Sequence, residues 1–154
     1  MTTTITGALG IDNIKAATGA VLQVVNVTFA TVVSTGATGW SDSGMSLTIT
    51  PTSATSKILL FASHNGINRS GAGYLGSTLT RNSTQLIRFD GSAGYDTGSG
   101  TKYLTGSSVC YLDSPGTTSS TIYKTQLQNG SNGNSAGINV DSAVSTITAM
   151  EIAG

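Results

Sequence analysis

The sequence predicts an all-β protein: an antiparallel β-sandwich of jelly-roll type, preceded by a short N-terminal docking segment. Ser and Thr make up about 30% of the 154 residues, alongside 20 Gly and two Pro, which favours strands and turns over helices. Short apolar or β-branched segments recur along the chain, separated by clusters of Gly, Ser, Asn and Pro. The length suits one domain, so residues 21–154 form the sandwich and residues 1–20 an attachment segment.

The attachment segment carries the signals of a short helix. Asp12 precedes the stretch NIKAAT and Gly19 follows it, which indicates an N-cap, about two helical turns and a glycine stop. A helix of that length is not stable alone in water, so it must dock on a partner or on its own domain. Both alternatives remain open. The residues expected to make the docking contacts are Ile11, Asp12, Ile14 and Leu22.

The first two predicted strands have one apolar face each. Residues 21–33 are long and β-branched, and every second side chain from Val25 to Val33 shares a face. Residues 45–50 alternate strictly, with Met45, Leu47 and Ile49 on one side and Ser or Thr on the other. This period of two is typical of a strand with one buried and one solvated face.

The third predicted strand, residues 57–63, does not alternate. Its run Ile58–Phe61 puts apolar side chains on both sheet faces, and residues 144–152 do the same. We expect one face to meet the opposite sheet and the other to meet a second subunit in a homotrimer. The alternative is a cover formed by a loop or by the N-terminal segment. The expected interface residues are Leu59, Phe61, Met150 and Ile152.

Five further strands complete the predicted sandwich: residues 73–81, 84–89, 107–113, 121–128 and 136–140. Two Gly- and Ser-rich stretches beside them carry aromatic residues, Trp40 in one and Tyr95 with Asp96 in the other. Aromatic side chains offer a large contact area at low entropy cost, so we expect these residues to contact a glycan or a protein partner. The alternative is an aromatic side chain that plugs the end of the sandwich.

The sequence offers little for catalysis or metal binding. It has six Asp, one Glu, one His and one Cys, which supply neither a zinc set nor a nucleophile with its base. We therefore expect no catalytic, cofactor-binding or metal-binding residues, and a protein that is not an enzyme. The single Cys110 has no partner in the chain for a disulfide, and we expect it to be buried in its strand as a small hydrophobe.

The charge and hydropathy of the chain limit the classes of partner that we expect it to bind. Seven cationic and seven anionic residues cancel, so there is no basic footprint for nucleic acid. No apolar run approaches the length of a membrane span, so we expect no membrane insertion. The start MTTTITGALG lacks the pattern of a signal peptide, which predicts synthesis and assembly in a cytoplasm.

Four sequence segments, taken in order along the chain, resemble one protein family. GIDNIKAATGAVLQVVNVTF, SLTITPTSATSKILLF, YLDSPGTTSSTIYKTQLQ and STITAMEIAG are similar to the C-terminal β-domain of fibre-type structural proteins of tailed bacteriophages. The resemblance spans most of residues 10–154. It implies a trimeric jelly-roll head, similar to the C1q and tumour-necrosis-factor sandwich, displayed on the virion surface after assembly in the host cytoplasm.

The resemblance implies a tail-fibre-like protein that attaches to other virion proteins through residues 1–20 and presents its loops to the host. Fibre proteins usually carry a long shaft before this domain, whereas about twenty residues precede the first predicted strand here. A capsid decoration, cement or head-fibre protein is therefore an alternative. A lectin or C1q-like binding module unrelated to virions is an alternative of another class.

Overall fold

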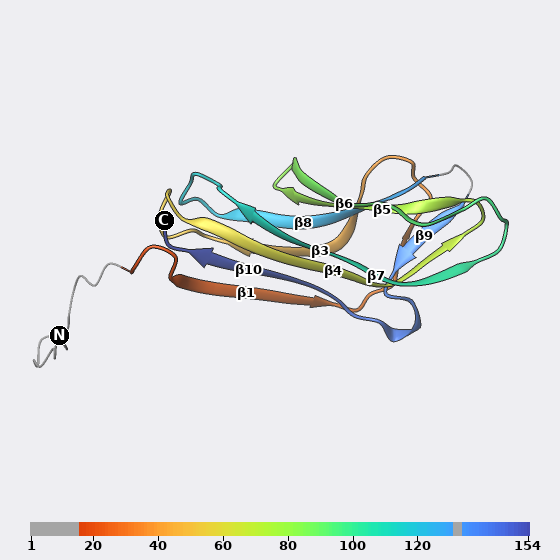
Figure 1. Cartoon of the computed structure of the whole chain (residues 1–154), viewed down its shortest axis with the longest axis horizontal. Helices are drawn as coiled ribbons and strands as arrows, with labels where there is room; N and C mark the ends of the chain where they lie inside the picture. The colour runs from red at the N-terminus through yellow and green to blue at the C-terminus, as the bar shows by residue number, and fades with distance from the viewer. Residues whose placement is uncertain (1–15, 131–133) are drawn as a thin grey trace, which may run out of the picture.

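The computed structural model describes residues 16–130 and 134–154, with only the backbone at Asp96, and shows two antiparallel sheets packed as a sandwich (Figure 1). Sheet A contains β1 (Val21–Phe29), β10 (Ser145–Ile152), β4 (Lys57–Ser70), β7 (Lys102–Asp113), β9 (Ser135–Ile138) and β2 (Val33–Thr35). Sheet B contains β3 (Ser41–Ile49), β8 (Thr121–Asn129), β5 (Gly73–Arg81) and β6 (Thr84–Asp96). The predicted fold class is confirmed.

The strand order is that of a jelly roll. Sheet A runs β1-β10-β4-β7 and faces β3-β8-β5-β6 in sheet B, so consecutive strands repeatedly change sheet. The long β4 is the centre of sheet A. It pairs with β7 along one edge, and with β10 and then β9 along the other.

The first predicted strand, residues 21–33, is wrong as one element because the chain leaves the sheet between β1 and β2. β1 pairs with β10, whereas β2 pairs with β9, and the 3₁₀ turn η1 (Val140–Ser142) separates those two partners. Asn139, Asp141 and Ser142 have left-handed backbones that cannot continue a ladder. The Asn139 amide instead donates a hydrogen bond to the Thr31 carbonyl at 2.9 Å.

The core lies between the sheets and divides into two clusters. The larger cluster confirms the predicted inward face of β3. Its buried members are Met45, Leu47, Ile49, Ile58, Leu60, Ala62, Leu79, Tyr123, Ile147 and Ala149. The smaller cluster lies toward β9 and contains Ile67, Leu75, Leu127, Ala136 and Ile138. Val25, Val27 and Phe29 pack against the larger cluster as expected, but Val33 packs against the smaller one.

The two-faced character of the third predicted strand is confirmed. Ile58 and Leu60 are fully buried on the inner side of β4, whereas Leu59 and Phe61 point away from the core. In β10, Ile147 and Ala149 face inward, and Met150 and Ile152 face outward.

The placement of Tyr95 and Asp96 in a loop is wrong, because both residues lie in β6. Pairing between β5 and β6 continues as far as Gly73 with Asp96. Several register shifts along this pair absorb the irregular stretch as bulges, which is how a Gly-rich sequence stays in a ladder. Trp40 does lie outside the strands, directly before β3.

A buried polar chain crosses the core. His64 on β4 is fully buried, with Nδ1 3.0 Å from Ser77 Oγ and Nε2 2.8 Å from Thr125 Oγ1. Thr125 Oγ1 in turn lies 2.6 Å from Ser43 Oγ on β3. Burial lowers the pKa of His64 to about 4, and the nearby charge of Asp90 opposes this shift only in part. The imidazole is therefore neutral at pH 7.

This histidine makes stability depend on pH. An unfolded imidazole titrates near pH 6.5 and the folded one near pH 4, so the unfolded state takes up the proton first as the pH falls. We expect the free energy of unfolding to fall by about 2 kcal/mol between pH 7 and pH 5, measured by urea titration. His64 is the single histidine, so His64→Gln should lose far less over this range. An equal loss in the variant would contradict the assignment.

Two buried carboxylates hold the end of the sandwich where β10 finishes. Asp113 on β7 accepts hydrogen bonds from Arg81 Nη1, at 2.9 Å to each carboxylate oxygen, and from the Tyr123 hydroxyl at 2.6 Å. Burial raises the pKa of Tyr123, and its hydrogen bond to Asp113 adds to the rise. These contacts join β5, β7 and β8.

The second of these carboxylates is Glu151 on β10. It accepts hydrogen bonds from Gln23 Nε2 at 2.6 Å and from both the backbone N–H and the hydroxyl of Thr52 at 2.7 Å. Burial alone would raise the pKa of Glu151, but these donors outweigh it and hold the pKa at about 2. The charged carboxylate thereby fastens the β3–β4 connection to β1 and β10.

Candidate functional site

The outer face of sheet A carries a row of apolar side chains. The register aligns one residue from each of four neighbouring strands: Val24, Met150, Leu59 and Leu112. Phe61 follows two residues after Leu59 on β4, and Ile152 lies two residues beyond Met150 on β10. We call these six residues the apolar band. Val24 is 55% exposed, Leu112 50% and Phe61 42%, so the described chain leaves this face open to solvent.

The rows beside the apolar band become more polar along the strands. The next row contains Phe61, itself a member of the band, together with Asn26, Thr148 and Cys110. The row after it contains Thr28, Thr146, Ser63 and Ser108. Neither row has a charged side chain. At the other edge of the band, the exposed Lys57 pairs with Ile152 on the same outward face. An exposed apolar patch with charge only at its edge is typical of a protein–protein interface.

The structure thus brings together all four predicted interface residues, Leu59, Phe61, Met150 and Ile152. It adds Val24 and Leu112, which sequence reasoning missed. Val24 lies on the opposite side of β1 from Val25 and Val27. The only sign of its role in the sequence is that it is an apolar residue on the side of the strand that faces away from the core.

The expectation of a buried Cys110 is wrong, because its side chain is exposed. Cys110 pairs with Phe61 across β4 and β7 and shares its outward face. The segment SSVCYLD has apolar residues at both parities, so the pattern did not decide which set faces the core. Val109 and Tyr111 are the residues that pack inward.

A second surface lies on the outer face of sheet B. The guanidinium carbon of Arg88 on β6 lies 5.5 Å from the ring centroid of Trp40 and 5.9 Å from that of Tyr74 on β5. The Tyr74 hydroxyl accepts a hydrogen bond from Gln128 Nε2 at 3.3 Å. The Tyr74 ring packs so closely on Gly130 that a Cβ there would overlap it. Trp40, Tyr74, Arg88 and Gln128 form what we call the arginine cluster.

An ion pair lies beside the arginine cluster. Asp42 on β3 accepts hydrogen bonds from Lys124 Nζ and Gln126 Nε2, each at 2.7 Å. The hydrogen bond from Lys124 is the main cause that lowers the pKa of Asp42. Both carboxylate oxygens are therefore engaged, and the charge of Lys124 is matched.

Of the predicted contact residues, Trp40 joins a cluster but does not plug the core. Tyr95 is 66% exposed near the end of β6. Among the described residues no ring contact joins it to Trp40, and the side chain of Asp96 lies outside the described part. Sequence reasoning missed Tyr74, Arg88 and Gln128, because they come from three strands that only the register brings together.

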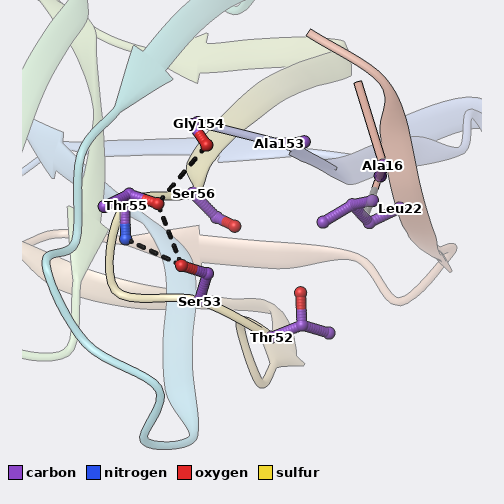
Figure 2. A pocket seen from close by; sticks show the side chains of 8 residues that line it. All are labelled: Ala16, Leu22, Thr52, Ser53, Thr55, Ser56, Ala153 and Gly154. Carbon is purple, nitrogen blue, oxygen red and sulfur yellow. Dashed lines mark hydrogen bonds between the residues drawn. The ribbon is translucent and has the colours of Figure 1, made fainter. Parts of the chain in front are cut away.

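A hollow of about 260 Å³ lies where the described chain begins and ends (Figure 2). Its lining residues are Ala16, Leu22, Thr52, Ser53, Thr55, Ser56, Ala153 and Gly154. Leu22 is the described member of the predicted docking set, and it borders this hollow. Ile11, Asp12 and Ile14 lie outside the described residues. Residues 13–15 of the expected helix also lie outside the described part. Residues 16–18 are described and are not helical; the chain turns there at Gly19, which has φ 87°.

Within residues 16–130 and 134–154, no three side chains of His, Cys, Asp or Glu gather as metal ligands. The same part of the chain contains no helix with the length and apolarity needed to cross a membrane.

No protein-family model and no curated protein matches the chain. Among the solved structures that match it is the infectious bursal disease virus VP2 subviral particle, at 14% sequence identity and a TM-score of 0.36. The match covers 97% of this chain and 42% of that one, so the chain spans less than half the length of the viral protein. At this TM-score the likeness carries no functional argument.

Proposed function

We propose that the protein is a non-enzymatic structural protein of a phage virion surface, a tail-fibre-like homotrimer whose subunits meet through the apolar band. The band is the observation that carries the proposal. It places six apolar side chains on one open face, and their burial in a subunit contact would contribute about 25 cal/mol for each Å² of apolar surface. The virion class and the three-fold symmetry come from the sequence resemblance over residues 10–154.

The position of the ends supports outward display. Ala153 exchanges hydrogen bonds with Gly19 and Ala20, each at 2.8 Å, where β1 begins and β10 finishes. Trp40 precedes β3, whose pairing with β8 starts toward the opposite end of the sandwich (Figure 1). Attachment through residues 1–20 at one end therefore leaves Trp40 and Tyr95 toward the other, where contact with a host surface is unobstructed.

The first test is the native mass in solution. Sedimentation equilibrium at micromolar concentration should give three times the 15.5 kDa chain mass. The mass of one chain would overturn the self-association, and that of two chains would overturn the three-fold symmetry.

The second test distinguishes the alternatives. Immunogold electron microscopy of virions, with antibody raised against residues 21–154, should label the tail. Label over the head would instead support a capsid decoration or head-fibre protein, with the hollow beside Leu22 near the attachment point. Absence of label from the virion would leave the lectin or C1q-like alternative.

A further inference from the structure

Arg88 differs from Arg81 and Lys124, the cations whose ion pairs the structure describes. Arg81 pairs with Asp113 and Lys124 with Asp42. Arg88 is exposed, yet no carboxylate oxygen among the described residues lies within 4.0 Å of its guanidinium. The chain has only seven cationic residues and no net charge, so an exposed guanidinium without a described carboxylate partner is an unusual feature of its surface.

The guanidinium is also fixed in place. Arg88 Nη2 donates a hydrogen bond to the Gly91 carbonyl at 2.9 Å, and Nε donates to the Asp90 carbonyl at 3.4 Å. The rings of Trp40 and Tyr74 flank it at cation–π distance. Nη1 donates no hydrogen bond to a described residue. The fold has therefore already ordered the side chain, and it leaves donors directed to solvent, which lowers the entropy cost of binding an anion.

The neighbours of Arg88 suit a sugar. Trp40 and Tyr74 are half-buried, so each offers part of a ring to the C–H face of a pyranose. The amides of Gln126 and Gln128 lie on the same face. Each donates one hydrogen bond, to Asp42 or to Tyr74, and has a second N–H and a carbonyl oxygen that can bind hydroxyl groups. An arginine donor forms its strongest contacts with a carboxylate or a phosphate group. Aromatic surface, amides and one open cation together match a sugar that carries one negative charge.

We propose that the arginine cluster binds an acidic saccharide, with Arg88 contacting the carboxylate or phosphate group and Trp40 or Tyr74 contacting the sugar ring. The assignment rests on the proposed function, because it names the class of host glycan that an outward-facing protein would meet. The contact predicted from the sequence involves Trp40, Tyr95 and Asp96; this assignment keeps Trp40 and places the contact on the outer face of sheet B.

The test is binding of the full chain to immobilised oligosaccharides of three kinds: uronic-acid-containing, phosphate-bearing and neutral. The wild type should bind one or both acidic kinds and not the neutral kind, and the two acidic arms tell carboxylate from phosphate. Arg88→Gln should weaken binding by roughly ten- to a hundred-fold, because a hydrogen bond to a charged group is lost. Lys57→Gln removes the same charge from the outer face of sheet A, away from the arginine cluster, and should bind as the wild type does.

The native mass and the circular dichroism spectrum of each variant show whether it still folds and assembles. Failure to bind any acidic oligosaccharide, equal binding of the neutral kind, or wild-type binding by Arg88→Gln would overturn the site. Suppose that one of these results is obtained, but the wild type has the mass of three chains and the antibody labels the virion. The proposed function then stands and only the sugar site fails. The mass of a single chain overturns the proposed function independently of any sugar result.

Discussion

Asp113→Ala is expected to lower the free energy of unfolding by about 3 kcal/mol, near the lower end of the range for breaking a buried ion pair. The carboxylate is 7% exposed and accepts three hydrogen bonds, from Arg81 and Tyr123. Its removal leaves the Tyr123 hydroxyl buried without its acceptor and Arg81 without its counter-charge. Arg81 is 27% exposed, so water can hydrate it in part, and this keeps the loss from being larger.

Asp42→Ala is the matched control for that change. It removes a carboxylate from an ion pair of similar length with Lys124, but the Asp42 side chain is 53% exposed. Such pairs contribute at most about 1 kcal/mol. Urea denaturation at pH 7 and one protein concentration measures both variants. Equal losses would show that the burial of Asp113 is not what makes its pair important.

Leu59→Glu should convert the proposed trimer into single chains at micromolar concentration. Leu59 lies within the apolar band between Met150 and Leu112, so a carboxylate there would lose its hydration among apolar side chains in a subunit contact. The side chain points away from the core, and the single chain should therefore still fold. Sedimentation equilibrium should give the 15.5 kDa chain mass in place of three times that value.

Thr48→Glu serves as the comparison for this variant. Thr48 is exposed on β3 in sheet B, outside the apolar band, and the same substitution there should leave the mass of three chains unchanged. If Leu59→Glu also keeps that mass, the subunits do not meet through this face. Circular dichroism of both variants confirms that the comparison is between folded proteins.

The sequence predicts the parts of this fold that depend on neighbouring residues. Alternation in residues 45–50 determines which side of β3 is buried, because each side chain's face follows from its parity. The same rule predicts the two apolar faces of β4 and β10. Leu59, Phe61, Met150 and Ile152, the four outward residues predicted as an interface, do gather on one surface.

What the sequence does not predict depends on distant partners. The break after Phe29 follows from the left-handed turn at Asn139, more than a hundred residues later. Tyr95 lies in a strand because the bulged pairing of β6 with β5 extends that far. The arginine cluster draws Arg88, Tyr74 and Gln128 from different strands, and no local pattern marks them. The exposure of Cys110 could not be predicted, because its segment has apolar residues at both parities and only the pairing with β4 decides which set faces the core.

The gradient on the outer face of sheet A has a mechanical consequence. The apolar residues lie toward the end where β10 finishes, and the row of Thr28, Thr146, Ser63 and Ser108 toward the opposite end has only short hydroxyl side chains. Subunits that associate through this face adhere at the base and only weakly above it. If the proposed trimer is pulled apart, its subunits separate first at the end opposite the one where β10 finishes, and the separation then advances along the strands. The force needed therefore rises as the separation approaches Leu59 and Met150, where the assembly resists detachment most strongly.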